Sequence, residues 1–131
     1  MLSFQSIVQL MYFVQLFHSS EELLNNFHKR WFFKKLSFKF FLLFEIAHNI
    51  FWGLVIFIPN FPFRFPLLGL FILLMFANGI EHVVWYMWEK KYVPGLLTAS
   101  IHIIIFIVFF FSYFFKIEYL RYFSDSYYFF L

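Results

Sequence analysis

The chain contains no cysteine and few charged residues. Without cysteine it can form neither disulfide bonds nor metal sites built from thiolates. Only 13% of its residues are charged, against about 25% in ordinary soluble domains. The formal net charge of +3 is small, and the lysines and arginines lie between apolar segments. This pattern matches membrane topology, so we expect no nucleic-acid partner.

Apolar side chains dominate the composition. Of the 131 residues, 63% are hydrophobic and 26 are phenylalanine. A soluble domain of this length has too small a core to bury so much apolar surface. The sequence therefore predicts a single integral membrane domain, residues 1–131.

Four apolar segments have the length of membrane-spanning helices. A helix of about 20 residues crosses the hydrocarbon core, and the segments cover about residues 2–24, 40–58, 66–88 and 96–115. Prolines at 59, 62 and 94 mark breaks between them. The first segment has no basic start and no cleavage signal, so we expect it to be retained. We predict an all-α transmembrane four-helix bundle, with residues 116–131 as an aromatic tail at the membrane interface.

The basic residues predict the orientation of the bundle. Most of them fall in the first and third loops, namely Lys29, Arg30, Lys34, Lys35, Lys39, Lys90 and Lys91. Loops rich in lysine and arginine stay in the cytoplasm. Both the N-terminus and the C-terminus are then expected on the outer side. His28 belongs to the first loop, so we expect it at the headgroup surface without a role in a site.

Three of the segments contain polar residues at the spacing i, i+3, i+4, which shares one face of a helix. These triplets are His18, Glu21 and Glu22, then Glu45, His48 and Asn49, and then Asn78, Glu81 and His82. In the fourth segment, His102 follows Thr98 by one turn. Trp52 and Trp85 follow the second and third triplets and are expected to pack rather than react.

The predicted topology places these polar residues at nearly one depth. Those of the second, third and fourth segments lie about two turns from the cytoplasmic end of each helix. The first triplet lies about one turn shallower. An ionisable side chain inside the bilayer costs roughly 2.5–3.5 kcal/mol, so it faces the protein interior and marks function by default. The sequence thus predicts one polar site in the cytoplasmic half of the bilayer.

A metal centre is the leading interpretation of this site. Helix bundles hold di-iron and di-manganese ions with inward carboxylates and imidazoles, and Glu45-x-x-His48 matches their local signature once. The same groups would suit zinc with an open water position and a glutamate as general base. The candidate ligands of a divalent Zn, Fe or Mn ion are His18, Glu22, Glu45, His48, Glu81, His82 and His102. The candidate catalytic residues are Glu21, Glu22 and Asn78.

Three other interpretations stay open. The adjacent acids Glu21 and Glu22 beside His18 could carry out metal-free acid–base chemistry on a lipid-like substrate. A proton or metal-ion carrier would need a polar route to both faces, and the outer halves of the later segments offer little polarity. A small structural subunit would use the polar network only to fix helix pairing.

The motif His18-Ser19-Ser20-Glu21-Glu22 resembles the signature of the HXXEE-domain family of small bacterial membrane proteins. Asn78-x-x-x-His82 and the stretch 90–98, KKYVPGLLT, are similar to that family's later motifs, in the same order and spacing. The resemblance covers about residues 14–102. It implies a membrane protein of unknown function that is suspected of enzymatic activity, and it carries over His18, Glu21, Glu22, Asn78 and His82. The remaining candidates rest on helix geometry alone.

We therefore expect a metal-dependent membrane enzyme in the bacterial cytoplasmic membrane. Its reaction would be the hydrolysis of a lipid or another membrane-embedded substrate. The alternative is a non-enzymatic carrier or subunit. The oligomeric state is left open.

Overall fold

The computed structural model describes residues 3–30 and 36–128, and of residues 114–128 it describes the backbone alone. This part of the chain is all-helical and contains no strand. Its five helices are α1 (Phe4–Leu24), α2 (Phe27–Arg30), α3 (Phe38–Phe57), α4 (Arg64–Glu89) and α5 (Leu96–Tyr128). The predicted all-α class is confirmed.

Three helices are long and apolar enough to cross a membrane. They are α3, α4 and the part of α5 from Leu96 to Tyr113, and their limits lie within a few residues of the predicted segments. The helix α1 has 21 residues but is not among these candidates. Its glutamines and the motif around His18 make it the most polar of the long helices.

Hydrogen bonds at the helix ends explain where the elements begin and end. The side chains of Ser3 and Ser37 accept hydrogen bonds from the first turns of α1 and α3, as serine at this position is suited to do. At the turn between α3 and α4, the Arg64 guanidinium donates to the backbone oxygens of Val55 and Ile56. It also donates to Gln5 Oε1 at 2.6 Å. Arg64 thus joins the ends of three helices.

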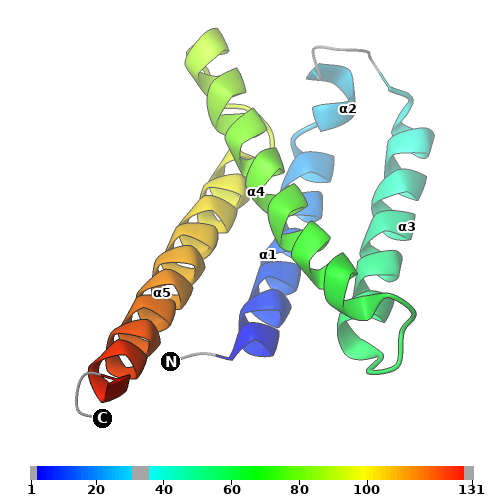
Figure 1. Ribbon diagram of the computed structural model, residues 1–131. Coiled ribbons are helices and arrows are strands. Elements are labelled where there is room, and N and C mark those ends of the chain that lie inside the picture. The colour runs from blue at the N-terminus through cyan, green and yellow to red at the C-terminus, as the bar shows by residue number, and fades with distance from the viewer. Residues whose placement is uncertain (1–2, 31–35, 129–131) are drawn as a thin grey trace.

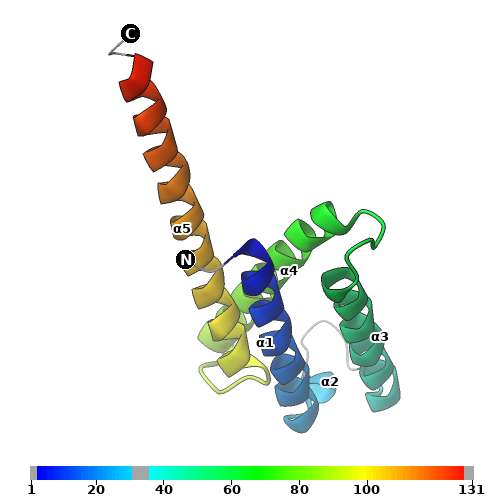
Figure 2. The ribbon, with the colours of Figure 1, turned by 90° about the horizontal axis from the view of Figure 1, so that it is seen from below.

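The helix α1 occupies the centre of the fold. It lies between α3 and α5 in both views of the molecule (Figures 1 and 2) and contacts each of the other four helices. The helices α4 and α5 make the most extensive contact of any pair. Their close approach depends on Gly79, where a Cβ atom would lie 2.9 Å from the backbone oxygen of Ala99.

The buried residues form three levels along the four long helices. At the level of the α3–α4 turn, an apolar cluster contains Val8, Met11, Trp52, Val55, Ile56, Leu68, Phe71, Ile72 and Met75. At the other end, Phe27, Phe41, Trp85 and Val93 form a second cluster. Between the clusters in sequence lie the buried polar residues Gln15, His18, Ser19, Glu22, Glu45, His82 and His102. The predicted polar triplets therefore do contribute to one common level, and both tryptophans pack as expected.

The helix α5 runs past the predicted span and continues to Tyr128, because residues 96–128 contain no glycine or proline to stop it. One expectation, for His28, needs correction. His28 is not at the surface, since it is buried between Phe38 and Phe41. The predicted loop residues 31–35 and the tail residues 129–131 lie outside the described part of the chain.

Candidate metal centre

The side chains of His18, Glu22 and His82 meet in the buried polar level. Glu22 Oε1 lies 3.1 Å from His82 Nε2 and 3.4 Å from His18 Nε2. The two rings meet edge to face, with their centroids 4.9 Å apart. All three residues are at most 5% exposed. One ligand atom from each falls within 4.8 Å of the others, so the group could hold a metal ion.

His18 is held in a defined orientation by Thr98. The His18 Nδ1 atom lies 2.8 Å from Thr98 Oγ1. The other polar neighbours of that hydroxyl are Glu21 Oε2, at 2.6 Å, and the backbone oxygen of Gly95, at 3.2 Å. Both neighbours accept hydrogen bonds, so the hydroxyl proton is directed to one of them and Oγ1 accepts from His18 Nδ1–H. The lone pair of the neutral ring therefore sits on Nε2, the atom that faces Glu22.

Asn78 approaches the same lone pair from α4. Its Nδ2 atom lies 2.8 Å from His18 Nε2, and an amide N–H can only donate. The interaction agrees with the tautomer that Thr98 imposes. Asn78 thus occupies the lone pair through which His18 would bind an ion, and its amide would have to move off Nε2 when an ion binds.

Glu21 points away from this group and caps α5. Its carboxylate accepts hydrogen bonds from the backbone N–H groups of Leu97 and Thr98, at 3.2 and 3.0 Å. It also accepts from the Thr98 hydroxyl and, at 2.6 Å, from Tyr92 Oη. Burial and the bond to Glu21 raise the pKa of Tyr92 to about 12. A carboxylate at a helix N-terminus satisfies otherwise unpaired N–H groups and the helix dipole.

Gly95 brings the turn before α5 into contact with the three candidate ligands. Its φ is +86°, and a Cβ atom there would lie 2.7 Å from Cε1 of both His18 and His82. The same atom would lie 3.0 Å from Glu22 Cγ. Only glycine fits this conformation and this space.

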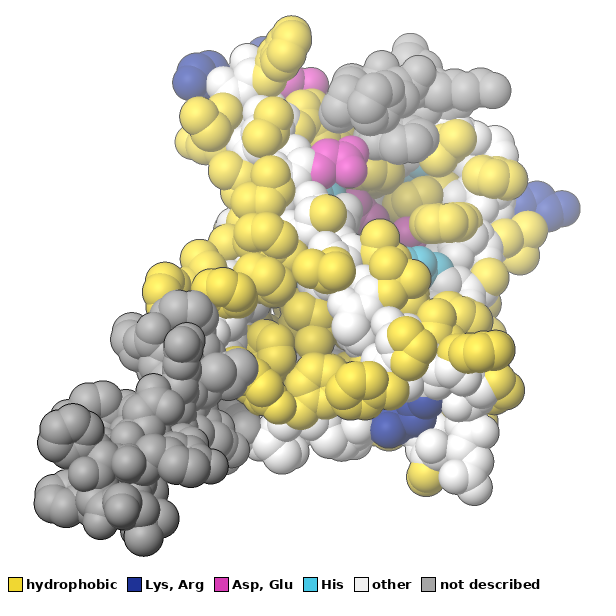
Figure 3. Space-filling model, viewed as in Figure 1, with side chains coloured by type: hydrophobic (Ala, Val, Ile, Leu, Met, Phe, Trp, Pro, Cys, Tyr) yellow, Lys and Arg dark blue, Asp and Glu magenta, His cyan; other side chains and the backbone are white. Residues whose placement is uncertain are grey.

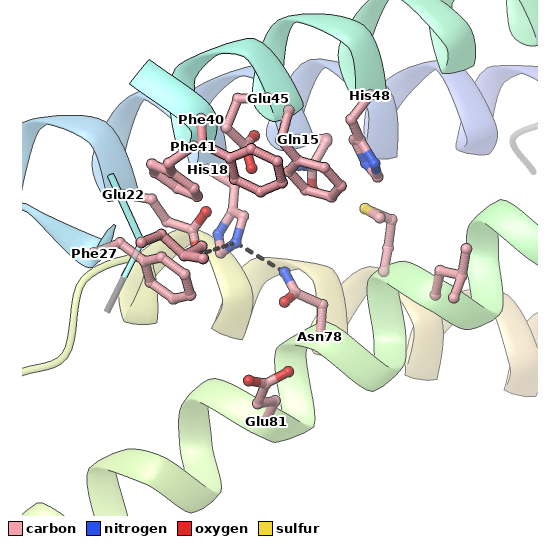
Figure 4. A pocket seen from close by; sticks show the side chains of 14 residues that line it. Gln15, His18, Glu22, Phe27, Phe40, Phe41, Glu45, His48, Asn78 and Glu81 are labelled. Carbon is pink, nitrogen blue, oxygen red and sulfur yellow. Dashed lines mark hydrogen bonds and ion pairs between the residues drawn. The ribbon is translucent and has the colours of Figure 1, made fainter. Parts of the chain in front are cut away.

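A cavity of about 540 Å³ adjoins the group. Its apolar walls come from Phe27, Leu36, Phe40, Phe41, Phe44, Leu74 and Met75, and its polar wall includes Gln15, His18, Glu22, Glu45, His48, Asn78 and Glu81. Figure 3 shows the hollow between α3 and α4, where carboxylates and a histidine are visible inside an apolar rim. In the close-up, Gln15, Glu45 and His48 lie on the α1 and α3 side, and Asn78 and Glu81 extend from α4 (Figure 4).

Several buried polar atoms at this level have no hydrogen-bond partner within the described part of the chain. They include Gln15 Oε1, Glu45 Oε2, His48 Nε2, His82 Nδ1 and both ring nitrogens of His102. Such atoms are uncommon, because burial without a partner costs about 1–3 kcal/mol. They mark the places where a bound species would add most stabilisation.

The structure brings together some of the predicted ligands. His18, Glu22 and His82 form the compact group. Glu45, His48 and Glu81 line the cavity beside it. His102 is fully buried, and its ring centroid lies 6.0 Å from that of His18. Among the predicted catalytic residues, Glu22 belongs to the group, Asn78 lies beside it and Glu21 faces α5.

Three residues around the site were not among the predicted site residues. Thr98 orients His18, Gly95 leaves room for the ligands, and Gln15 lines the cavity. Each carried a signal in the sequence: a threonine one turn before His102, a glycine directly after a proline, and a glutamine one turn before His18 in an apolar segment.

Comparison with known proteins identifies one family. The model of the family described as "Protein of unknown function with HXXEE motif" matches residues 9–110. Neither the curated proteins nor the solved structures contain a match to the chain.

Proposed function

The chain belongs to the HXXEE family, whose function is unknown, and from the geometry of its site we propose that it is a metal-dependent membrane enzyme of the hydrolytic type. The observation that carries the proposal is the meeting of His18, Glu22 and His82 from two helices far apart in sequence. The resemblance found in the motif and the buried group point to the same residues.

The chemistry of the three donors suits a divalent ion. Two imidazoles and one carboxylate, with a fourth position open to water, form the ligand set of many catalytic zinc sites, and the same donors accept iron or manganese. A buried carboxylate is costly unless it is paired or coordinates a metal. A metal-ligating histidine is usually oriented by a hydrogen bond from its other ring nitrogen, and His18 makes such a bond to Thr98.

The bound ion and the surrounding residues would have separate roles in the reaction. A bound divalent ion would supply a Lewis acid and lower the pKa of its water. Asn78 lies beside His18 Nε2 and would orient an oxygen of the substrate. Glu45, buried on the opposite wall of the cavity, would accept or deliver a proton as general base or acid.

The cavity favours a substrate from the membrane. Its walls are mostly phenylalanine, leucine and methionine, and it hollows the face between two helices that are apolar enough to span a membrane. Large side chains such as Phe40, Phe44 and Leu74 are exposed along these helices. A lipid or another membrane-embedded molecule could enter sideways between α3 and α4.

We also propose the membrane arrangement. The helix α1 would cross the bilayer with α3, α4 and α5 as a four-helix bundle. The other helices would lie between α1 and the lipid. Both termini would lie outside, and the basic ends near α2 and the α4–α5 turn would lie in the cytoplasm. The protein would then be a single multi-pass domain of the bacterial cytoplasmic membrane, with residues 116–131 at the outer interface.

An enzyme agrees with the structure better than a carrier. The apolar cluster of α1, α3 and α4 fills the level between the polar site and the α3–α4 turn. A carrier would need polar groups along that route. Substrate and water would instead reach the site from the cavity side.

Metal-free acid–base catalysis is the second candidate. A ligating histidine usually donates its other ring N–H to an acceptor, and His82 Nδ1 has no such partner within the described residues. In this alternative, Glu22 and His82 would exchange a proton across their 3.1 Å contact.

An activity assay in lipid nanodiscs would test the proposed function. Wild-type protein would be reconstituted in a bacterial polar-lipid extract with zinc, iron(II) or manganese(II), and new lipid products would be detected by mass spectrometry. We expect products with at least one metal and a loss of at least about 100-fold in Glu22→Gln. Glu89→Gln, which changes a surface carboxylate paired with Arg30, serves as the matched control. Equal product formation with and without Glu22, or metal-loaded protein that leaves all lipids unchanged, would contradict the proposal.

A further inference from the structure

A second polar group lies on the α1 and α3 wall of the cavity, apart from the three candidate ligands. It consists of the lining residues Gln15, Glu45 and His48 (Figure 4), with Ser19 hydrogen-bonded behind Gln15. Gln15 and Glu45 are only 3% and 5% exposed. Among the described side chains, neither residue forms an ion pair that would account for its burial.

Ser19 connects the members of this group. Its Oγ accepts hydrogen bonds from the amides of Gln15, at 3.3 Å, and Asn49, at 2.8 Å. Its own hydroxyl proton is therefore available to a nearby acceptor. Asn49 is fixed as well, because its amide also donates to the backbone oxygen of Glu45. Both amide nitrogens thus donate within the protein, while the amide oxygens of Gln15 and Asn49 are buried without a partner in the described residues.

The atoms that remain without a partner in the described chain are mainly acceptors. Gln15 Oε1 can only accept a hydrogen bond, and Glu45 Oε2 accepts when the carboxyl is ionised. His48 Nε2, one turn beyond Glu45, can accept as well. Both glutamine and glutamate belong to the lining of the cavity. A ligand that satisfies them must supply hydrogen-bond donors.

We infer that this wall, Gln15, Glu45 and His48, binds the head group of a lipid with a long apolar chain and a hydrogen-bond-donating head, an ammonium or a hydroxyl. The phenylalanines of the same cavity would surround the chain. Head groups that only accept, such as carboxylates and esters, would leave the oxygens of Gln15 and Glu45 without donors. The inference rests on the proposed function for its catalytic meaning and deepens it: the lipid would be held by a donor-bearing head at this wall, and the bond to be hydrolysed would lie elsewhere in the same molecule.

Native mass spectrometry of the full chain in detergent would test this selectivity. The probes are hexadecan-1-amine, hexadecan-1-ol, hexadecanoate and methyl hexadecanoate, which share one chain and differ in the head. We expect the amine or the alcohol to bind about tenfold to a hundredfold more tightly than the acid and the ester. Preference for the amine alone identifies an ionic contact with Glu45, and equal binding of the alcohol identifies a neutral donor. Equal binding of all four probes would overturn the inference.

The variant Glu45→Gln tests whether the preference for donor-bearing heads comes from this polar group or from general hydrophobic binding. Its side chain has nearly the same shape but presents an N–H donor, so we expect the preference to shrink or to move toward the ester. Glu89→Gln, on the surface, should keep the wild-type order. An unchanged order in Glu45→Gln would contradict the assignment. Metal content measured on the same samples distinguishes the two proposals. Selective binding without metal would contradict only the proposed function. Bound metal without selectivity would contradict only the inference.

Discussion

The imidazole of His18 donates from Nδ1 to the hydroxyl of Thr98, 2.8 Å away across the contact between α1 and α5. The hydroxyl is itself bound to Glu21 at 2.6 Å. Two residues separated by 80 positions in the chain thereby fix which nitrogen of His18 carries the lone pair. The orientation of the candidate ligand is a property of the helix packing.

Replacing Thr98 by valine tests this orientation. Valine has nearly the same shape but cannot accept the His18 proton, so we expect metal affinity to fall about 10- to 100-fold. Competition against a chromophoric chelator measures the change. Thr98→Ser keeps the hydroxyl and is expected to bind metal like the wild type. Equal affinity in the valine variant would show that the tautomer of His18 does not depend on Thr98.

Glu21 is expected to act on stability rather than on metal binding. Glutamine removes the charge that faces the N-terminus of α5, which we expect to cost about 0.5–2 kcal/mol of folding free energy. Thermal unfolding in detergent, followed by tryptophan fluorescence, would show a lower Tm for Glu21→Gln. The folded fraction should retain its metal. A normal Tm combined with lost metal would place Glu21 in the centre instead.

Gly95 and Gly69 form a matched pair of glycine positions. Alanine at 95 would place a methyl group 2.7 Å from His18 and His82 at a φ of +86°. We expect Gly95→Ala to weaken metal binding and to destabilise the fold by about 1–3 kcal/mol. A Cβ atom at Gly69 meets nothing within 4 Å, so Gly69→Ala in α4 should be neutral or stabilising by up to about 1 kcal/mol. Similar behaviour of the two variants would contradict the tight approach of the turn to the ligands.

The raised pKa of Tyr92 predicts how the stability of the fold changes at alkaline pH. Its pKa is raised to about 12, by burial and then by the bond to Glu21, above the value of about 10 in an unfolded chain. Between these values the unfolded state has lost the proton that the folded state keeps, so stability falls as pH rises. Below pH 10 the group adds no pH dependence. Thermal unfolding from pH 9 to 12 should therefore show a steeper decline in the wild type than in Tyr92→Phe. Parallel curves for the two proteins would refute the Glu21–Tyr92 contact.

Much of the fold was predictable because the bilayer leaves a simple pattern in the sequence. Apolar length located α3, α4 and the first part of α5, since a helix must match the hydrocarbon thickness. The shared level of Glu22, Glu45, His82 and His102 was predictable for a related reason. Ionisable groups that cannot face lipid must face one another.

The different roles of Glu21, which caps α5, and Glu22, a candidate ligand, were not predictable. Adjacent helical residues point about 100° apart, and their partners, Tyr92 and Thr98 for one and His82 for the other, lie more than fifty positions away in the chain. Spacing alone treats both as members of one triplet. Only the packing of α1 against α4 and α5 separates a helix cap from a candidate ligand.

The most direct test of the metal centre is the metal content of detergent-purified protein, measured by elemental analysis. We expect about one divalent ion per chain in the wild type, and its loss in Glu22→Gln and in His82→Ala. Glu81→Gln and His102→Ala, which change residues outside the compact group, should keep the ion. Sub-stoichiometric metal in well-folded wild type would contradict the centre and favour metal-free proton exchange between Glu22 and His82. Metal that survives both ligand substitutions would contradict the centre as well, because the ion would then be bound elsewhere.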